Sequence, residues 1–144
     1  MTKDVKEKVI QKLNEILEME ISGVVRYLHY SLMITGPNRI PIVKWFQDQA
    51  TEGFGHASQI GEKITSLGGH PTLKVRPVPE TNKHGTLEIL KESLEFEKEA
   101  EKMYRELLPL TEDYVSLNEM IRALLCDEQN HIEEVEKMLK VNKE

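Results

Sequence analysis

The chain has a single cysteine, few aromatic residues and no long apolar run. One thiol, Cys126, excludes an internal disulfide and the paired Cys-x-x-Cys type of metal site. No apolar segment approaches the ~20 residues that a membrane-spanning helix needs, so we expect no membrane partner. The first residues, MTKDVKEKVIQK, lack the apolar block of a secretory signal, which predicts a cytoplasmic protein.

Acidic residues outnumber basic ones, 25 to 19. The net charge is -6 and no basic cluster stands out, so nucleic acid is not an expected partner. The 144 residues are 39% hydrophobic and 31% charged, which is typical of a globular chain with one sizeable core. We therefore expect residues 1–144 to form a single domain.

The patterning is helical. Aromatic residues make up only 6% of the chain, Glu, Lys and Leu abound, and no segment alternates convincingly as a strand would. Gly36-Pro37, Gly68-Gly69 and Pro109 interrupt the pattern, and Ser116-x-x-Glu119 has the form of a capping box, although the fourth helix can begin a few residues earlier. The predicted helices span about 2–35, 41–67, 87–108 and 116–141.

The connections predict how these helices are arranged. About five residues join the first two helices and about seven join the last two, so each pair should form an antiparallel hairpin. The middle connection, GGHPTLKVRPVPETNKHGT (68–86), is long enough to cross the length of a bundle. The predicted fold is all-α: a four-helix bundle of two antiparallel hairpins joined by a long crossover.

Ionisable residues interrupt the apolar stripes of these helices. In the segment LLCDEQNHIEEVEKML, helical spacing places Glu128 and His131 in line with aliphatic residues. The same spacing places Glu20, His56 and Glu97 in the stripes of the other three helices, each near mid-length, and it begins the stripe of the third helix at Leu87. Every helix thus directs at least one metal-ligand type of residue toward the core.

The two hairpins also resemble each other. Glu20 and Tyr27 are seven residues apart, as are Glu97 and Tyr104, with an offset of 77 residues between the pairs. His56 and His131 have a similar offset, 75 residues. This pseudo-repeat predicts one site with matching contributions from both halves of the chain.

Metal binding explains these residues best. Several buried carboxylates at one level would repel one another and lose solvation, and divalent cations remove both penalties. Oxygen and imidazole ligands without thiolate suit iron or manganese, and zinc is also compatible. The alternative is a non-catalytic helical binding module in which an inward polar network fixes the helix register. His29, His70 and His84 are assigned no role, and the last two lie in the crossover.

Three segments carry a resemblance to a known family: LNEILEMEISGVVRYLHYSLM, HASQIGEKITSLGGHPTLK and DYVSLNEMIRALLCDEQNHIEEVE. The chain resembles the ferritin-like superfamily, and most closely the bacterioferritins, over nearly its whole length. In that family a di-iron centre is held by Glu, E-x-x-H, Glu and E-x-x-H on four successive helices. The resemblance implies two iron ions per chain and carries the ligands over to Glu20, His56, Glu97, Glu128 and His131.

The second helix departs from the family pattern. Gly53 stands three residues before His56, and the nearest acid, Glu52, stands four before it. Glu52 is the expected sixth ligand, because a residue at this spacing still faces the same side of a helix. An asymmetric centre or a single well-held metal are the alternatives.

Haem binding departs as well. Bacterioferritins bind haem between subunits through a Met placed between the Glu and His of this helix, and Phe54 stands there instead. The resemblance therefore supplies no haem ligand at this position, and Met19 and Met33 are the remaining candidates.

The resemblance implies a ferroxidase for iron storage or detoxification, with Fe(II) and O2 or H2O2 as reactants and a homo-oligomer, at least a dimer, as the assembly. Glu20 and Glu97 would be terminal ligands, and Glu128 and Glu52 would bridge the two ions. Tyr27 and Tyr104 would orient the ligating carboxylates. The predicted catalytic residues are Glu20, Glu97, Glu128, Tyr27 and Tyr104. The alternative within the same chemistry is a rubrerythrin-like peroxidase or other di-metal oxidoreductase, which would need an external electron donor.

Overall fold

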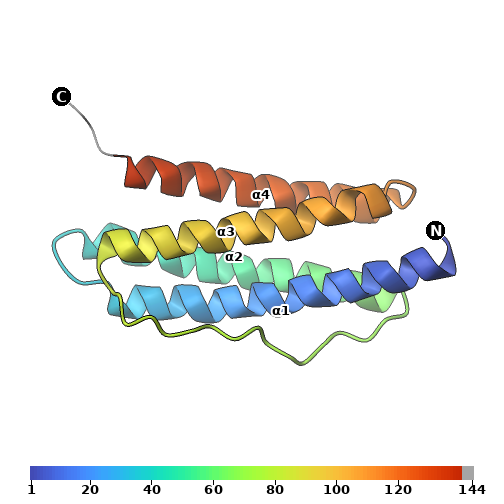
Figure 1. Cartoon of the computed structure of the whole chain (residues 1–144), viewed down its shortest axis with the longest axis horizontal. Coiled ribbons are helices and arrows are strands. Elements are labelled where there is room, and N and C mark those ends of the chain that lie inside the picture. Colours follow the sequence, from blue (N-terminus) through green and yellow to red (C-terminus); the bar gives the residue numbers. More distant parts are fainter. Residues whose placement is uncertain (141–144) are drawn as a thin grey trace.

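The computed structural model describes residues 1–140, and these form four long helices with no strand among them (Figure 1). The helices are α1 Lys3–Met33, α2 Arg39–Ser66, α3 Thr86–Leu107 and α4 Val115–Leu139, with a short 3-10 helix, η1, at Leu108–Leu110. The predicted all-α class is confirmed. The predicted end of the fourth helix near Val141 lies outside the described residues.

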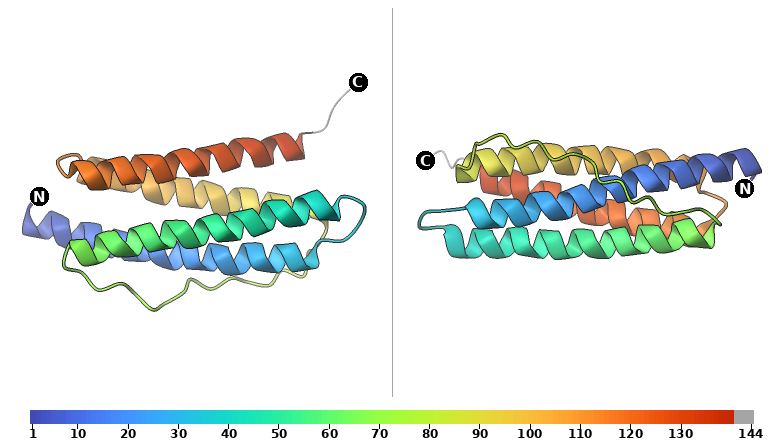
Figure 2. Two further views of the ribbon diagram at one scale, coloured as in Figure 1. Left: turned by 180° about the vertical axis from the view of Figure 1, so that it is seen from behind. Right: turned by 90° about the horizontal axis from the view of Figure 1, so that it is seen from below.

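The helices pair as the loop lengths predict. The α1–α2 hairpin and the α3–α4 hairpin lie against each other, and the segment between α2 and α3 runs back along the outside of the bundle beside α1 (Figures 1 and 2). Asn14 of α1 holds the start of this crossover, since its side chain donates to the His70 carbonyl (3.1 Å) and accepts from the Thr72 amide (2.8 Å). Further along, Arg76 pairs with Glu99 of α3 at 2.7 Å. The crossover is therefore attached to both hairpins.

The helix ends follow local chemistry, with one correction. Thr2 caps α1 by accepting from the Val5 amide at 3.3 Å. The capping box predicted at Ser116-x-x-Glu119 is wrong, because α4 begins one residue earlier, at Val115, with no side-chain cap. The Ser116 hydroxyl instead accepts a hydrogen bond from Lys63 Nζ of α2 at 2.9 Å, so a contact between hairpins replaces the local cap.

The apolar stripes pack together in the centre of the bundle. The helices α1, α2 and α4 each contribute fully buried side chains to this core, among them Leu13, Phe46, Ile60 and Ile121. Leu87 was expected in the stripe of the third helix, but it is 59% exposed, since the helix phase buries Ile89 and Leu90 at this end. Within residues 1–140, no helix combines the length and apolar character required to span a bilayer. The aliphatic layers enclose the polar side chains at mid-length.

Candidate metal centre

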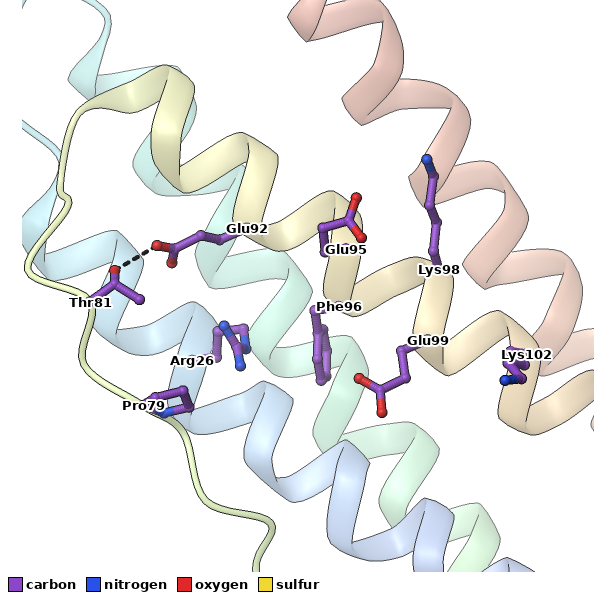
Figure 3. A pocket seen from close by; sticks show the side chains of 9 residues that line it. All are labelled: Arg26, Pro79, Thr81, Glu92, Glu95, Phe96, Lys98, Glu99 and Lys102. Atoms are coloured by element: carbon purple, nitrogen blue, oxygen red, sulfur yellow. Dashed lines mark hydrogen bonds between the residues drawn. The ribbon is translucent and has the colours of Figure 1, made fainter.

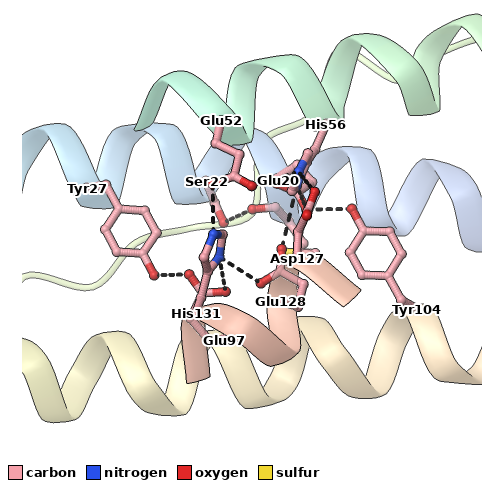
Figure 4. A network of polar contacts seen from close by, with 11 residues as sticks. Glu20, Ser22, Tyr27, Glu52, His56, Glu97, Tyr104, Asp127, Glu128 and His131 are labelled. Atoms are coloured by element: carbon pink, nitrogen blue, oxygen red, sulfur yellow. Dashed lines mark hydrogen bonds and ion pairs between the residues drawn. The ribbon is translucent and has the colours of Figure 1, made fainter. Parts of the chain in front are cut away.

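Six ionisable side chains meet inside the bundle at mid-length (Figure 4). They come from all four helices: Glu20 on α1, Glu52 and His56 on α2, Glu97 on α3, and Glu128 and His131 on α4. Three carboxylates and one imidazole of this set are almost fully buried, with exposed fractions of 3–4%. These are the six residues that the sequence analysis singled out.

The side chains form two groups that share Glu128. His56 Nδ1 lies 3.5 Å from Glu20 Oε1 and 3.6 Å from Glu128 Oε1. His131 Nδ1 lies 3.7 Å from Glu97 Oε2 and 3.9 Å from Glu128 Oε2. Each group offers one imidazole nitrogen and two carboxylate oxygens that lie within 4.8 Å of one another. One oxygen of Glu128 therefore faces each half of the centre.

The inward-facing atoms have the properties of metal ligands. His56 Nδ1, His131 Nδ1 and Glu128 Oε2 are buried and have no hydrogen-bond partner among residues 1–140. A buried polar atom left without a partner costs about 1–3 kcal/mol, so three at one place need an explanation. A pair of cations bound by these oxygen and nitrogen donors would satisfy all three atoms, and the donor set suits iron, manganese or zinc.

Electrostatics within the centre favour bound positive charge. Burial lowers the pKa of His56 and His131, but the surrounding carboxylates outweigh it and raise the pKa of each imidazole to about 12. Burial and the charge of Glu97 raise the pKa of Glu128. Burial also opposes charge on Glu97, yet its contacts with Glu128 and His131 lower its pKa. Without metal, protons therefore occupy atoms that cations would take.

Two tyrosines hold the terminal carboxylates, and they do so across the bundle. Tyr27 of α1 donates a hydrogen bond to Glu97 Oε1 of α3, and Tyr104 of α3 donates to Glu20 Oε1 of α1 at 2.5 Å. Burial, reinforced by the nearby carboxylates, raises the pKa of both hydroxyls, so they remain protonated donors. Each hairpin thus orients the carboxylate of the other.

Glu52 approaches the histidines from the opposite side to Glu128. Its Oε2 lies 2.7 Å from His131 Nε2, and its Oε1 lies 3.5 Å from His56 Nε2. Hydrogen bonds with His131 and then His56 lower the pKa of Glu52 to about 2. Glu52 is 34% exposed at its side chain, so it lies at the outer edge of the centre. Its role as a metal ligand stays a prediction.

Asp127 is a residue that the sequence analysis missed. Its Oδ2 lies 3.2 Å from His56 Nε2, so the outer nitrogen of this imidazole faces Asp127 as well as Glu52. Asp127 precedes Glu128 and lies off the apolar stripe of α4. The contact joins α2 to α4, and no spacing within either helix indicates it.

Gly53 faces the centre from α2 and contributes no side chain. A Cβ atom there would lie 3.6 Å from Glu20 Oε2 and 3.4 Å from Val24 Cγ2, which are ordinary contacts. A cavity of about 10 Å³ borders Gly53, Gly23 and the ligand set, with room for at most one water molecule. The position three residues before His56 therefore points inward but carries no carboxylate.

The sequence pattern of the ferritin-like domain family matches residues 10–144, nearly the whole chain. The chain belongs to the ferritin-like family. It is 31% identical over 137 residues to a bacterioferritin of Brucella melitensis, an alignment that covers 92% of this chain and 83% of that one.

Solved structures agree with this assignment. A ferritin-like, diiron-carboxylate protein of Bacillus anthracis superposes with a TM-score of 0.89 at 30% identity and covers 97% of this chain and 100% of its own. A bacterioferritin of Rhodobacter capsulatus, described with a metal-free dinuclear site and a haem iron, superposes with a TM-score of 0.80 at 26% identity, over 92% and 84% of the two chains. Their overlap with this ferritin-like chain spans all four helices.

The three haem-related positions of this ferritin-like chain differ in exposure. Phe54 is 63% exposed on α2, whereas Met19 is fully buried in the core. A haem bound between subunits needs a ligand at the surface, so burial removes Met19 as a candidate. Met33, at the end of α1, is partly exposed and is the remaining methionine of the two.

Proposed function

We propose that this ferritin-like protein binds two Fe(II) ions at the centre and oxidises them to Fe(III), for storage or detoxification of iron. The observation that carries the proposal is the pair of groups that share Glu128, each with a buried imidazole nitrogen that lacks a hydrogen-bond partner within the described chain. The bacterioferritin relative and the diiron-carboxylate structure support iron as the metal.

In this proposal each residue has a separate task. Glu128 contacts both ions and offsets their mutual repulsion, while Glu20 and Glu97 are terminal ligands held by the tyrosine hydroxyls. His56 and His131 each provide one neutral nitrogen. Glu52 is the sixth ligand or, through the outer nitrogens, the residue that orients both imidazoles.

The reaction balances with Fe(II) as substrate. Two Fe(II) ions release two electrons, and O2 takes up these electrons and two protons to become H2O2. If H2O2 is the oxidant, two electrons and two protons convert it to two water molecules. His56 and His131 are protonated before metal binds, because their pKa is raised, and metal binding releases these protons into the centre.

The same observation weighs against a non-catalytic role. A polar network that only fixed the helix register would be expected to satisfy its own buried atoms, because a partly satisfied network destabilises the bundle. Here His56 Nδ1, His131 Nδ1 and Glu128 Oε2 are left without hydrogen-bond partners. A rubrerythrin-like peroxidase with an external donor uses the same centre and is the alternative to test.

Anaerobic titration with Fe(II) tests the proposal. Uptake should break at about two equivalents per chain, and admitting O2 or H2O2 should then produce Fe(III) rapidly. A break at one equivalent would mean that the second metal position is lost because Gly53 provides no carboxylate. No Fe(II) uptake would overturn the proposal. Repeated turnover of H2O2 with a reductant, without accumulated Fe(III), would favour the peroxidase.

We also propose that copies of the chain associate, at least as a dimer. Val25, Leu28 and Leu32 form an apolar stripe on α1 with exposed fractions of 49%, 51% and 65%, and Phe54 of α2 is 63% exposed. A second copy would remove this apolar surface from water. Sedimentation of the parent and of Leu32→Glu tests the association: the parent should be larger than a monomer and the variant should dissociate.

A further inference from the structure

A second group of metal-ligand residues lies outside the bundle core, where the crossover passes α1. His29 of α1 has its Nε2 2.8 Å from Glu80 Oε2, and His84 Nε2 lies 3.2 Å from Glu80 Oε1. The two imidazole rings are 5.7 Å apart between centroids. One donor atom from each of the three residues lies within 4.8 Å of the other two.

The backbone of the crossover positions Glu80 and His84. The Asn82 amide donates to Glu80 Oε1 at 2.7 Å, and Asn82 itself has a left-handed backbone with φ of 58°. This turn brings His84 back against Glu80, four residues earlier. The amide hydrogen bond, and then the neighbouring imidazoles, lower the pKa of Glu80, so its carboxylate is charged at neutral pH.

A small cavity lies beside these three side chains. It measures about 20 Å³, and His29, Glu80 and His84 are among the residues that line it. His29 Nε2 is buried and makes no hydrogen bond within residues 1–140, although Glu80 lies close to it. The cavity thus combines room for one ion with an imidazole nitrogen that lacks a hydrogen bond.

Most of the other polar side chains around the cavity make hydrogen bonds of their own, although Arg26 Nε makes none within residues 1–140. Tyr30 donates to Glu92 Oε2 at 2.9 Å, and Thr81 of the crossover donates to Glu92 Oε1 at 2.5 Å, which links the crossover to α3 (Figure 3). Arg26 donates to the Tyr30 hydroxyl at 2.9 Å and stacks over the Phe96 ring at 5.0 Å. Lys83 also lines the cavity, and its side chain makes no hydrogen bond or ion pair within residues 1–140.

We infer that His29, Glu80 and His84 form a separate site for one divalent transition-metal ion. Two imidazoles and one carboxylate suit Zn(II) and leave coordination positions for water. The ion would join α1 to the crossover and so restrain the segment that connects the two hairpins. The site shares no residue with the central site, so it does not depend on the proposed function.

Zn(II) titration by calorimetry tests this site. Every protein carries Cys126→Ser, because the exposed thiol would itself take up Zn(II). His29→Gln and His84→Gln should each bind about one Zn(II) fewer per chain than the parent. His70→Gln is the matched control, since His70 is an exposed crossover histidine outside the site, and it should bind as many as the parent. Equal binding by parent, His29→Gln and His84→Gln would overturn the inference.

A second measurement follows the crossover directly. Zn(II) should slow amide hydrogen exchange in residues 78–85 of the parent by several-fold or more, and should not do so in His84→Gln. In Glu128→Ala the central centre is disabled, yet the slowing should persist there. If Zn(II) no longer slows amide exchange in Glu128→Ala, the effect belongs to the central site and the inference is overturned. If the Fe(II) titration fails while Zn(II) still slows amide exchange in the crossover, the result counts only against the proposed ferroxidase.

Discussion

The two hairpins bring nearly the same residues to the centre, and they differ in the spacing of one pair. In α4, Glu128 precedes His131 by three residues, and Glu128 lies between the inner nitrogens of both imidazoles. In α2, Glu52 precedes His56 by four residues, and Glu52 lies at the outer nitrogens of both imidazoles. One residue of spacing separates these two arrangements.

The geometry of the α-helix explains the difference. Successive residues turn by about 100°, so positions three and four before a histidine fall on opposite sides of the direction in which that histidine points. Glu128 takes one side in α4 and Glu52 takes the other in α2, while Gly53 leaves the matching side of α2 without a carboxylate. A pseudo-repeat in sequence therefore produces a centre that is symmetric in its histidines and asymmetric in its carboxylates.

Removing the shared carboxylate should have the largest effect. Glu128→Ala removes the one carboxylate that faces both inner nitrogens, so rapid Fe(II) oxidation should fall by about 100-fold or more. That loss exceeds the loss typical of a residue that only supports a ligand. Helix content by circular dichroism should remain, because the apolar stripes are untouched. Glu133→Ala, on the exposed side of the same helix, is the control. Unchanged oxidation in Glu128→Ala would remove this residue from the centre.

The spacing in α2 can be tested by breaking and then rebuilding it. Glu52→Ala should slow oxidation by about 10–100-fold, because both imidazoles lose the carboxylate at their outer nitrogens. Adding Gly53→Glu in that background should recover part of the rate, because a Cβ at residue 53 meets only ordinary contacts beside Glu20.

The outcome also decides what Glu52 does. Loss of one equivalent in the Fe(II) titration of Glu52→Ala would identify it as a ligand, and two retained equivalents with a slower rate would identify it as an orienting residue. Asp127→Ala is the matched comparison, since Asp127 contacts His56 but not His131. An unchanged rate and titration in Glu52→Ala would reduce Glu52 to a solvated acid.

Proton release should show whether the two halves bind metal equally. Both histidines have a pKa raised to about 12 in the metal-free protein, so at neutral pH each must lose a proton before its nitrogen can bind a cation. In a chain that carries Cys126→Ser and His84→Gln, so that Zn(II) binds only the centre, filling the centre should release about two to three protons per chain. The apparent affinity should rise about tenfold per ion for each pH unit gained. Calorimetry in buffers of different ionisation enthalpy measures the protons.

The same experiment has a paired control. His56→Ala and His131→Ala should each lower the number of protons released by about one, because the two imidazoles have matching surroundings. A loss confined to one variant would contradict the symmetry of the histidines.

The smallest expected effect concerns the tyrosines. Tyr27→Phe and Tyr104→Phe each remove a hydroxyl that donates to a buried carboxylate, and each should lower the free energy of unfolding of the metal-free protein by about 1–3 kcal/mol. Urea denaturation with a chelator present measures this. Tyr114→Phe is the control, because its hydroxyl makes no hydrogen bond among residues 1–140. Very different values for Tyr27→Phe and Tyr104→Phe would show that the halves are not equivalent.

Much of the architecture was predictable. Helical periodicity, Gly and Pro interruptions and loop lengths predicted four helices in two hairpins, and the described structure agrees. The errors lie at helix ends: Leu87 is exposed, and Ser116 contacts Lys63 instead of capping α4. Terminal turns have few local constraints, so contacts with other helices decide their details.

It was also predictable that the central side chains point toward one another, whereas the specific contacts that each of them makes were not. The stripes indicated which side chains point inward, including Glu20, Glu97 and Glu128. They did not indicate that Asp127 meets His56, nor that Tyr27 and Tyr104 hold the carboxylate of the opposite hairpin. Those contacts join different helices, and their geometry depends on how the bundle packs.

The amino-acid sequence by itself determined the helices, their inward faces and the chemical type of the centre, because backbone hydrogen bonds impose a period of 3.6 residues that can be read locally. Only the tertiary structure decided which oxygen meets which nitrogen, and only it brought His29 to Glu80 and His84. The path of the crossover has no periodicity, and it is set by contacts such as those of Asn14 and Arg76 with distant residues. Local order in this protein follows from helix geometry, and long-range pairing follows from packing.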